Sequence, residues 1–324
     1  MENTCEMSLD LVGFGSAIID FAPANLGVPL SEVESFVPYA GGAVANVLVA
    51  ASRLGLKTRF LGCVGDDEFG AFIIRDFKRE GIDTSCVKQV KGRATGIAFY
   101  SVDEKGERHY VFYRFPGYAD PESTFRPEDI KPEYISKAKA LHFSESGLRH
   151  PHTREAVFHA VQIARKNRLI ISYDPNMRPD LWDDRKELLE IQRKAVSLAD
   201  IFVATFEEAK LIVGETSPKE TVRSILALGP STVVIREKMH YQVATRNRVF
   251  KVPVFRVKAV DTSGAGDAFD AGFLTGFLKG WSLEDAVRLG SAVAALKVSK
   301  AGTRAGLPRM KEALEFMRTR RKGT

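Results

Sequence analysis

Apolar positions along the chain follow two different periods. Short apolar runs at 140–144, 169–173, 201–204 and 232–235 predict buried strands. Between these runs, in stretches such as 185–199, apolar residues recur every three or four positions, which predicts helices packed on one face. Strands that alternate with helices are typical of a parallel sheet covered by helices. We therefore expect an α/β fold with a mostly parallel central sheet.

The N-terminal part follows the same order. Apolar residues concentrate at 9–14 and at 58–64, so we expect a strand in each. Helices are predicted at 43–54 and 69–80, because each stretch has helical spacing and is followed by a glycine that can end it.

Residues 93–115 have a different pattern. Apolar and polar residues alternate in 95–102 and again in 108–115, on either side of the turn 103–106. Two alternating runs around a short turn that contains glycine predict a β-hairpin.

The stretch 261–269 combines a glycine-rich turn with the start of a helix. It follows the apolar alternation of 252–257, which predicts a strand, and precedes the apolar residues 271–278, which predict a helix. The small residues Gly264, Ala265 and Gly266 allow backbone N–H groups to converge at the start of that helix. Such a helix N-terminus favours an anion, and a phosphoryl group in transfer fits it.

Asp267 follows directly after these donors. It is either a helix cap, since acidic residues are favoured in first turns, or a general base for a hydroxyl group beside the anion site. The turn is neither a Walker loop nor a dinucleotide-binding turn, because GK[ST] and GxGxxG are both missing.

Composition limits the choice of function. The 324 residues are 44% hydrophobic and 27% charged, which is ordinary for a globular protein, and the formal net charge of +6 suits an anionic substrate such as a nucleotide. We expect no nucleic-acid partner, because no dense basic stripe with interleaved aromatic residues is present. Three cysteines without CxxC spacing predict neither a disulfide framework nor a zinc site. No apolar run reaches about 18 residues and no signal peptide is recognised, so we expect a cytoplasmic protein without a membrane partner.

The stretch 261–269 resembles the C-terminal signature of the ribokinase-like (PfkB) carbohydrate kinases. A second segment, made of 41–46, 54–55 and 62–70, resembles their N-terminal signature. The resemblance covers nearly the whole chain. It implies a single domain, 1–324, with a three-layer sandwich and a small β-sheet lid from about 15–40 and 93–118. It also implies transfer of the ATP γ-phosphate to a sugar hydroxyl, with Mg2+ as cofactor, and we expect homodimers formed through the lid.

The resemblance assigns several residues to the sugar. Arg178 lies in a segment that resembles fructokinases and 2-keto-3-deoxygluconate kinases, where it contacts phosphate or substrate. Fructose is the first substrate that we expect and 2-keto-3-deoxygluconate the alternative. The other residues that the resemblance places at the sugar are Asp20, Gly41, Gly42, Asn46, Tyr113, Arg114 and Asp267 itself.

The resemblance assigns other residues to the nucleotide and to cations. Thr205 and Glu208 match the family's Asn-x-x-Glu only in part. They form either a capping box or a Mg2+ contact through water. Asp261 and Ser263, with 296–303, are expected to form a loop for a monovalent cation such as K+.

Arg236 stands where relatives have the first glycine of a Gly-x-x-Gly turn near the nucleotide phosphates, and Met239 stands at the second. This departure predicts a new phosphate contact by Arg236, an altered turn or impaired nucleotide binding. A non-catalytic sugar- or nucleotide-binding relative is therefore the alternative from another class. Gly264 and Gly266 would also contact the nucleotide.

Overall fold

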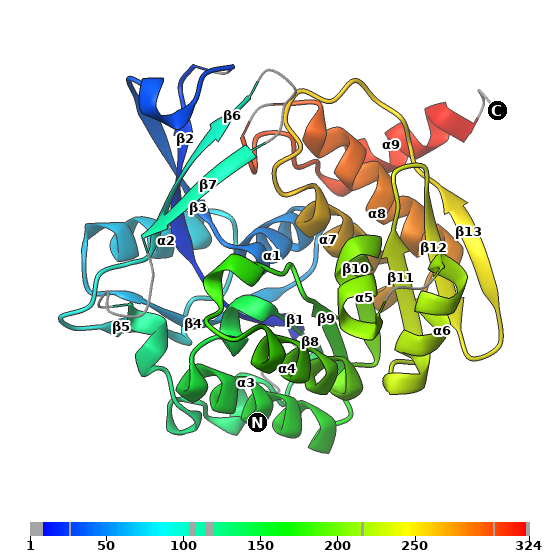
Figure 1. Cartoon of the computed structure of the whole chain (residues 1–324), viewed down its shortest axis with the longest axis horizontal. Coiled ribbons are helices and arrows are strands. Elements are labelled where there is room, and N and C mark those ends of the chain that lie inside the picture. Colours follow the sequence, from blue (N-terminus) through cyan, green and yellow to red (C-terminus); the bar gives the residue numbers. More distant parts are fainter. Residues whose placement is uncertain are drawn as a thin grey trace, which may run out of the picture.

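A nine-stranded sheet forms the centre of the computed structural model, which describes residues 9–25, 27–103, 108–113, 120–214, 217–300 and 302–321 (Figure 1). In spatial order its strands are β13 (Val249–Pro253), β12 (His240–Thr245), β11 (Thr232–Arg236), β10 (Ile201–Thr205), β9 (Ile170–Asp174), β8 (Ala138–Ser144), β1 (Leu9–Phe14), β4 (Thr58–Gly65) and β5 (Val87–Val90).

The strands from β11 to β5 run parallel, as the alternation of apolar runs and helices predicts. Only β12 and β13 at one edge are antiparallel. Because parallel strands end at the same edge, the residues after β1, β8, β9 and β10 meet there, and ligands bind at this edge in open α/β sheets.

Helices cover both faces of this sheet (Figure 1). Neighbouring strand residues alternate between two apolar cores: Leu11 faces one core and Val12 the other. Strands buried on both sides in this way are continuously apolar, which explains the short runs in the sequence. The first core contains residues of α1 (Ala43–Arg53), α2 (Glu68–Arg79), α7 (Ala265–Leu278), α8 (Leu283–Val298) and α9 (Met310–Arg321). The second contains residues of α3 (Pro151–Lys166), α4 (Arg185–Leu198), α5 (Phe206–Val213) and α6 (Pro218–Leu228).

A second, four-stranded sheet projects from the first (Figure 1). Its order is β3 (Phe36–Gly41), β2 (Ile18–Pro23), β6 (Ile97–Val102) and β7 (Arg108–Tyr113). The antiparallel pair β6–β7 confirms the predicted hairpin. All four strands lie close to the two ranges predicted for the lid, and this sheet is called the lid below.

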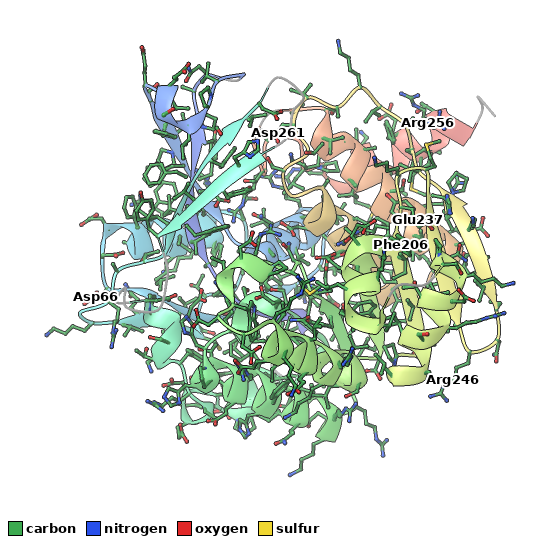
Figure 2. The ribbon with its side chains drawn as sticks, viewed as in Figure 1. Asp66, Phe206, Glu237, Arg246, Arg256 and Asp261 are labelled. Atoms are coloured by element: carbon green, nitrogen blue, oxygen red, sulfur yellow. The ribbon has the colours of Figure 1, made fainter. Side chains whose placement is uncertain are left out.

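The strand predicted at 252–257 is wrong in its position. β13 ends at Pro253, and the chain then runs to α7 without regular structure. The apolar alternation has another cause here, because this loop packs on α8: the Phe255 N–H donates to Ser291 Oγ at 3.0 Å and the Val260 N–H to the Val298 carbonyl at 2.7 Å. Figure 2 labels Asp261 in the same loop.

None of the helices in the described ranges is both long and apolar enough to cross a bilayer.

Candidate active site

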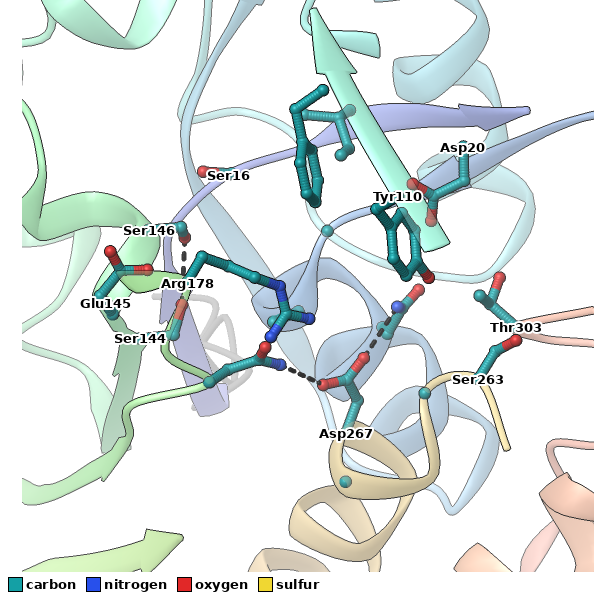
Figure 3. A pocket seen from close by; sticks show the side chains of 18 of the residues that line it. Ser16, Asp20, Tyr110, Ser144, Glu145, Ser146, Arg178, Ser263, Asp267 and Thr303 are labelled. Atoms are coloured by element: carbon teal, nitrogen blue, oxygen red, sulfur yellow. Dashed lines mark hydrogen bonds between the residues drawn. The ribbon is translucent and has the colours of Figure 1, made fainter. Parts of the chain in front are cut away.

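A cavity of about 450 Å³ lies where the lid, the ends of β8 and β9, and the start of α7 meet (Figure 3). Its lining is mainly polar. It brings together segments that are far apart in the sequence, around residues 16–20, 42–46, 110–112, 144–149, 176–181, 262–267 and 303.

The glycine turn at 264–266 forms one side of this cavity. Gly264 is the N-cap of α7 and has a left-handed backbone, with φ 60° and ψ 18°, which glycine adopts without strain. The Ala265 N–H donates to the Thr262 carbonyl at 3.2 Å. In the described part of the chain, the N–H groups of Gly264 and Gly266 have no such acceptor. The turn therefore presents two donors, rather than the three predicted, at the positive end of a helix dipole.

The Asp267 carboxylate lies beside these donors and is 6% exposed. Asn46 Nδ2 donates to its Oδ2 at 2.9 Å, and Asn176 Nδ2 donates to its Oδ1 at 3.3 Å (dashed lines in Figure 3). Burial disfavours the charged form and raises the pKa of Asp267 to about 6, although the Asn46 hydrogen bond acts in the opposite direction. A carboxylate with such a pKa is ionised at neutral pH and basic enough to accept a proton.

Two asparagines reach Asp267 from different elements. Asn46 lies in the first turn of α1, and its N–H bonds to the Gly42 carbonyl at 2.9 Å. Asn176 follows β9 and has a positive φ of 43°, which asparagine tolerates better than most residues. Its N–H donates to Asp174 Oδ1 at 3.1 Å, so the local turn aims its side chain at Asp267.

Arg304 was not predicted as a site residue. Its Nε donates to Asn46 Oδ1 at 3.2 Å, and its Nη1 donates to Asp76 of α2. Because Arg304 occupies the carbonyl oxygen of Asn46, the amide nitrogen of Asn46 must face Asp267. No sequence motif marks Arg304, since both of its partners are more than 200 positions away.

Asp20 lies on β2 with 6% exposure and lines the cavity, as does Gly42. Gly41 has a different role from the predicted contact. A Cβ at Gly41 would lie 2.1 Å from Asp20 Oδ2, so the glycine makes space for that carboxylate instead of lining the cavity itself.

On the lid, the predicted contact of Tyr113 is corrected. Tyr110 and Phe112 line the cavity, whereas Tyr113 is 43% exposed and packs edge-on against Phe99. Successive side chains of a strand point to opposite faces, so Tyr113 cannot share the face of Phe112. The predicted Arg114 lies outside the described residues.

Arg178 extends into the cavity, where its Nη1 donates to the Met177 carbonyl at 3.0 Å (Figure 3). Residues at and after the end of β8 that were not predicted complete this side: Ser144 Oγ lies 3.1 Å from Ser146 Oγ, and Arg149 Nε lies 3.9 Å from Glu145 Oε1. The lining of the cavity thus includes two arginine side chains, Arg178 and Arg149.

Arg236 does not point toward the cavity. Its Nη1 donates to Asp174 Oδ2 at 2.7 Å and to Asp270 Oδ1 at 3.0 Å, beneath the glycine turn. A Cβ at Gly266 would lie 3.4 Å from Arg236 Cζ. Burial opposes ionisation of Asp174, but the charge of Arg236 and the hydrogen bonds from Asp270 and Arg236 together lower the Asp174 pKa. Burial and the neighbouring Asp174 raise the pKa of Asp270 well above its usual range.

The segment after β11 is an altered turn. β11 ends at Arg236 and β12 begins at His240, and the Glu237 N–H donates to the His240 carbonyl at 3.1 Å. Met239 is 50% exposed. The departure from the family's glycine turn is thus a tight connection between antiparallel strands, and a phosphate contact by Arg236 stays a prediction.

Thr205 and Glu208 form the predicted capping box at the start of α5. Glu208 Oε2 accepts from the Thr205 N–H at 2.8 Å and from its hydroxyl at 2.7 Å, and Glu208 Oε1 accepts from the Met177 N–H at 2.8 Å. A carboxylate offers about four acceptor sites, so one remains for a water molecule. Across the described ranges, no three His, Cys, Asp or Glu side chains are grouped to hold a metal directly.

Asp261 and Ser263 form a closed loop before the turn. Asp261 Oδ1 accepts from the Ser263 N–H at 2.9 Å and from its hydroxyl, and Asp261 Oδ2 accepts from the Gly302 N–H at 2.7 Å. The ammonium of Lys297 donates to the Asp261 carbonyl at 2.8 Å. The predicted loop thus already contains a cation, and its residues do not fit a second one.

Comparison with known proteins agrees with this geometry. Residues 8–310 match the model of the protein family described as "pfkB family carbohydrate kinase". The chain belongs to the PfkB family of carbohydrate kinases. It is therefore an ATP-dependent carbohydrate kinase, and the alternative of a non-catalytic relative is not supported.

Individual PfkB relatives match almost the full length of the chain. The 5-dehydro-2-deoxygluconokinase of Clostridium perfringens is 33% identical over 316 residues, which are 95% of this chain and 93% of that protein. A Xylella fastidiosa fructokinase solved with bound ATP has a TM-score of 0.86 and 28% identity, covering 97% of this chain and 100% of the other. A double mutant of the Vibrio cholerae O395 fructokinase, solved with fructose, ADP and potassium, has a TM-score of 0.86 and 29% identity, covering 96% and 99%.

Proposed function

We propose that this PfkB kinase phosphorylates a deoxy keto sugar acid of the 5-dehydro-2-deoxygluconate type. The observation that carries the proposal is the set of curated relatives with that name, which are 31–34% identical over nearly the whole chain. Fructose, the substrate first expected from the sequence, has weaker support, since the two fructokinase structures described above are 28% and 29% identical to this chain.

The cavity offers a partner for the acid group. The Arg178 guanidinium lies in the cavity, and its planar fork matches a carboxylate, which fructose lacks. Asp20 and Asn46 would hold hydroxyl groups on the side near the lid, because a buried carboxylate and amide accept or donate hydrogen bonds to alcohols. Tyr110 and Phe112 would cover the sugar.

Asp267 would act as the general base. It would accept the proton of the attacking hydroxyl while that oxygen forms a bond to the γ-phosphorus and the bond to ADP breaks. The N–H groups of Gly264 and Gly266 would stabilise the charge on the transferred phosphoryl group. Mg2+ would neutralise charge on the ATP phosphates when bound, and Glu208 would reach it through water.

The test is a substrate panel at fixed ATP: 5-dehydro-2-deoxygluconate, 2-keto-3-deoxygluconate and fructose. We expect the highest kcat/KM for 5-dehydro-2-deoxygluconate. Arg178→Met should raise KM for the two sugar acids at least about tenfold, which corresponds to the loss of one charge-assisted hydrogen bond. Its KM for fructose should change little. Arg246→Met is the matched control, because Arg246 is exposed on the β12–β13 turn at the edge of the molecule (Figure 2). A tenfold preference for fructose would reject the proposal.

We also propose that two copies pair through the lid. The face of the lid opposite the cavity presents apolar side chains, with Val111 42% and Tyr113 43% exposed beside the stacked rings of Phe21 and Phe99. Exposed apolar surface of this kind marks interaction sites. Light scattering should show a dimer that Val111→Glu converts to monomers. A wild-type monomer at micromolar concentration would contradict this part.

A further inference from the structure

A lysine ammonium lies in the loop that the family resemblance assigns to a monovalent cation. Lys297 is in the last turn of α8, and its side chain is 0% exposed. Its Nζ donates to the Asp261 carbonyl oxygen at 2.8 Å and lies 4.0 Å from Asp261 Oδ1. A backbone carbonyl and a carboxylate are the oxygen ligands that a bound alkali cation would use, so the ammonium and the ion compete for the same atoms.

Asp261 connects this ammonium to the glycine turn. Its carboxylate accepts from the Ser263 N–H at 2.9 Å on one side and from the Gly302 N–H at 2.7 Å on the other. It thus ties the loop before α7 to the loop after α8. Gly264, which lines the cavity, follows only three positions after Asp261. A cation that holds Asp261 in place therefore also holds the phosphate donors.

Burial makes a second cation at this loop unfavourable. An ammonium and K+ carry the same charge, and like charges repel strongly where solvent does not screen them. A buried lysine itself costs free energy unless oxygen atoms compensate it, as the Asp261 carbonyl does here. Because the lysine is covalently attached, no ion has to be bound from solution.

We propose that Lys297 replaces the monovalent cation, so that this kinase neither binds nor needs K+ at this loop. By contrast, the double mutant of the Vibrio cholerae fructokinase was solved with a bound potassium ion. Lys297 is a positioning residue, because it acts on the phosphate donors through Asp261. The inference rests on the kinase assignment but not on the sugar, and its test uses nucleotide binding and thermal melting, which need no sugar.

The first measurement uses the wild-type protein in KCl and in choline chloride at equal ionic strength. We expect the same Kd for MgATP in both salts, within about twofold, and melting temperatures that agree within about 2 °C. Tighter ATP binding or a larger rise in melting temperature in KCl alone overturns the proposal.

The second measurement uses Lys297→Met, which removes the ammonium and keeps an apolar stem of similar length. In choline chloride it should melt lower than wild type and bind MgATP at least about tenfold more weakly, because small displacements of positioned donors are costly. KCl, and not choline chloride, should restore much of the melting temperature and of the affinity for MgATP. If Lys297 had only a structural role, the two salts should act alike. Lys300→Met, an exposed lysine three residues away, is the matched control and should respond to neither salt.

Equal behaviour of Lys297→Met in the two salts would overturn the replacement of K+ by Lys297. If the variant folds in neither salt, the wild-type comparison decides the question alone.

Discussion

Asn46 donates a 2.9 Å hydrogen bond to Asp267 across 221 positions of sequence. The bond joins the first turn of α1 to the first turn of α7, and these two turns carry the two sequence signatures of the family. It favours the ionised form of Asp267, whereas burial favours the protonated form. The balance leaves the carboxylate charged at neutral pH but still basic.

Asp267→Asn should lower kcat by about 10²–10⁴-fold, the usual contribution of general-base catalysis. MgATP binding should change little, since the donors of Gly264 and Gly266 are backbone groups. Unfolding free energy at pH 7 should not fall by more than about 1 kcal/mol, because the variant loses one accepted hydrogen bond but no longer buries a charge. Steady-state kinetics, calorimetry and a thermal melt measure the three values. A variant that melts like wild type and keeps more than about a tenth of its rate would leave Asp267 as a helix cap.

The pH dependence of kcat/KM should reflect the protonation of the Asp267 carboxylate. With a pKa of about 6, Asp267 is protonated below that pH, so kcat/KM should fall about tenfold per pH unit on the acid side and level off above pH 7. Protonation of ATP affects wild type and Asp267→Asn alike, so only the difference between their profiles counts. Parallel profiles for the two proteins would argue against Asp267 as the base.

The raised pKa also has a consequence for stability. The folded state binds the Asp267 proton more tightly than the unfolded chain, whose carboxyl has the ordinary pKa of 3.8. The resulting stabilisation is present below about pH 4 and is lost as pH rises through about 6, amounting to roughly 3 kcal/mol. Wild type should therefore lose stability relative to Asp267→Asn over this window. Denaturant unfolding of both proteins at pH 4 and pH 7 measures the difference, and a constant difference would contradict the shift.

Arg304→Met should reduce both stability and activity. It leaves Asp76 without its buried partner, which costs about 3–5 kcal/mol, and it releases the Asn46 amide that faces Asp267. Arg79→Met is the matched control: Arg79 contacts the same carboxylate at 2.5 Å but is 76% exposed, so its loss should cost at most about 1 kcal/mol. Urea unfolding and kcat separate the two variants, and equal effects would show that burial is not decisive here.

Arg236→Met should mainly destabilise the protein. Arg236 is paired with Asp174 and Asp270 below the glycine turn, and removing one member of a buried ion pair costs about 3–5 kcal/mol. Arg246→Met, on the exposed β12–β13 turn, should be neutral. If Arg236→Met keeps its stability and instead raises KM for ATP tenfold, Arg236 contacts phosphate as the sequence predicts.

The sequence alone determined the features that depend on neighbouring residues. Apolar periodicity predicted the strands β1, β8, β9, β10 and β11 to within a few residues, because burial on both faces requires continuous apolar runs. Local hydrogen bonding predicted the capping box of Thr205 and Glu208 at the start of α5. The glycine turn before Asp267 was equally visible, since a left-handed backbone selects glycine.

Only the tertiary structure decided which charged groups meet. Arg236 pairs inward, Arg304 orients Asn46, and the Lys297 ammonium lies on the Asp261 carbonyl. These partners are 34 to 258 positions apart, and no local pattern encodes such contacts. Likewise, the face of β7 that meets the cavity depends on its pairing with β6, so alternation alone could not choose between Tyr110 and Tyr113. Periodicity and turns arise from short-range sterics, whereas the electrostatics of the site arise from burial, which only packing of the whole chain produces.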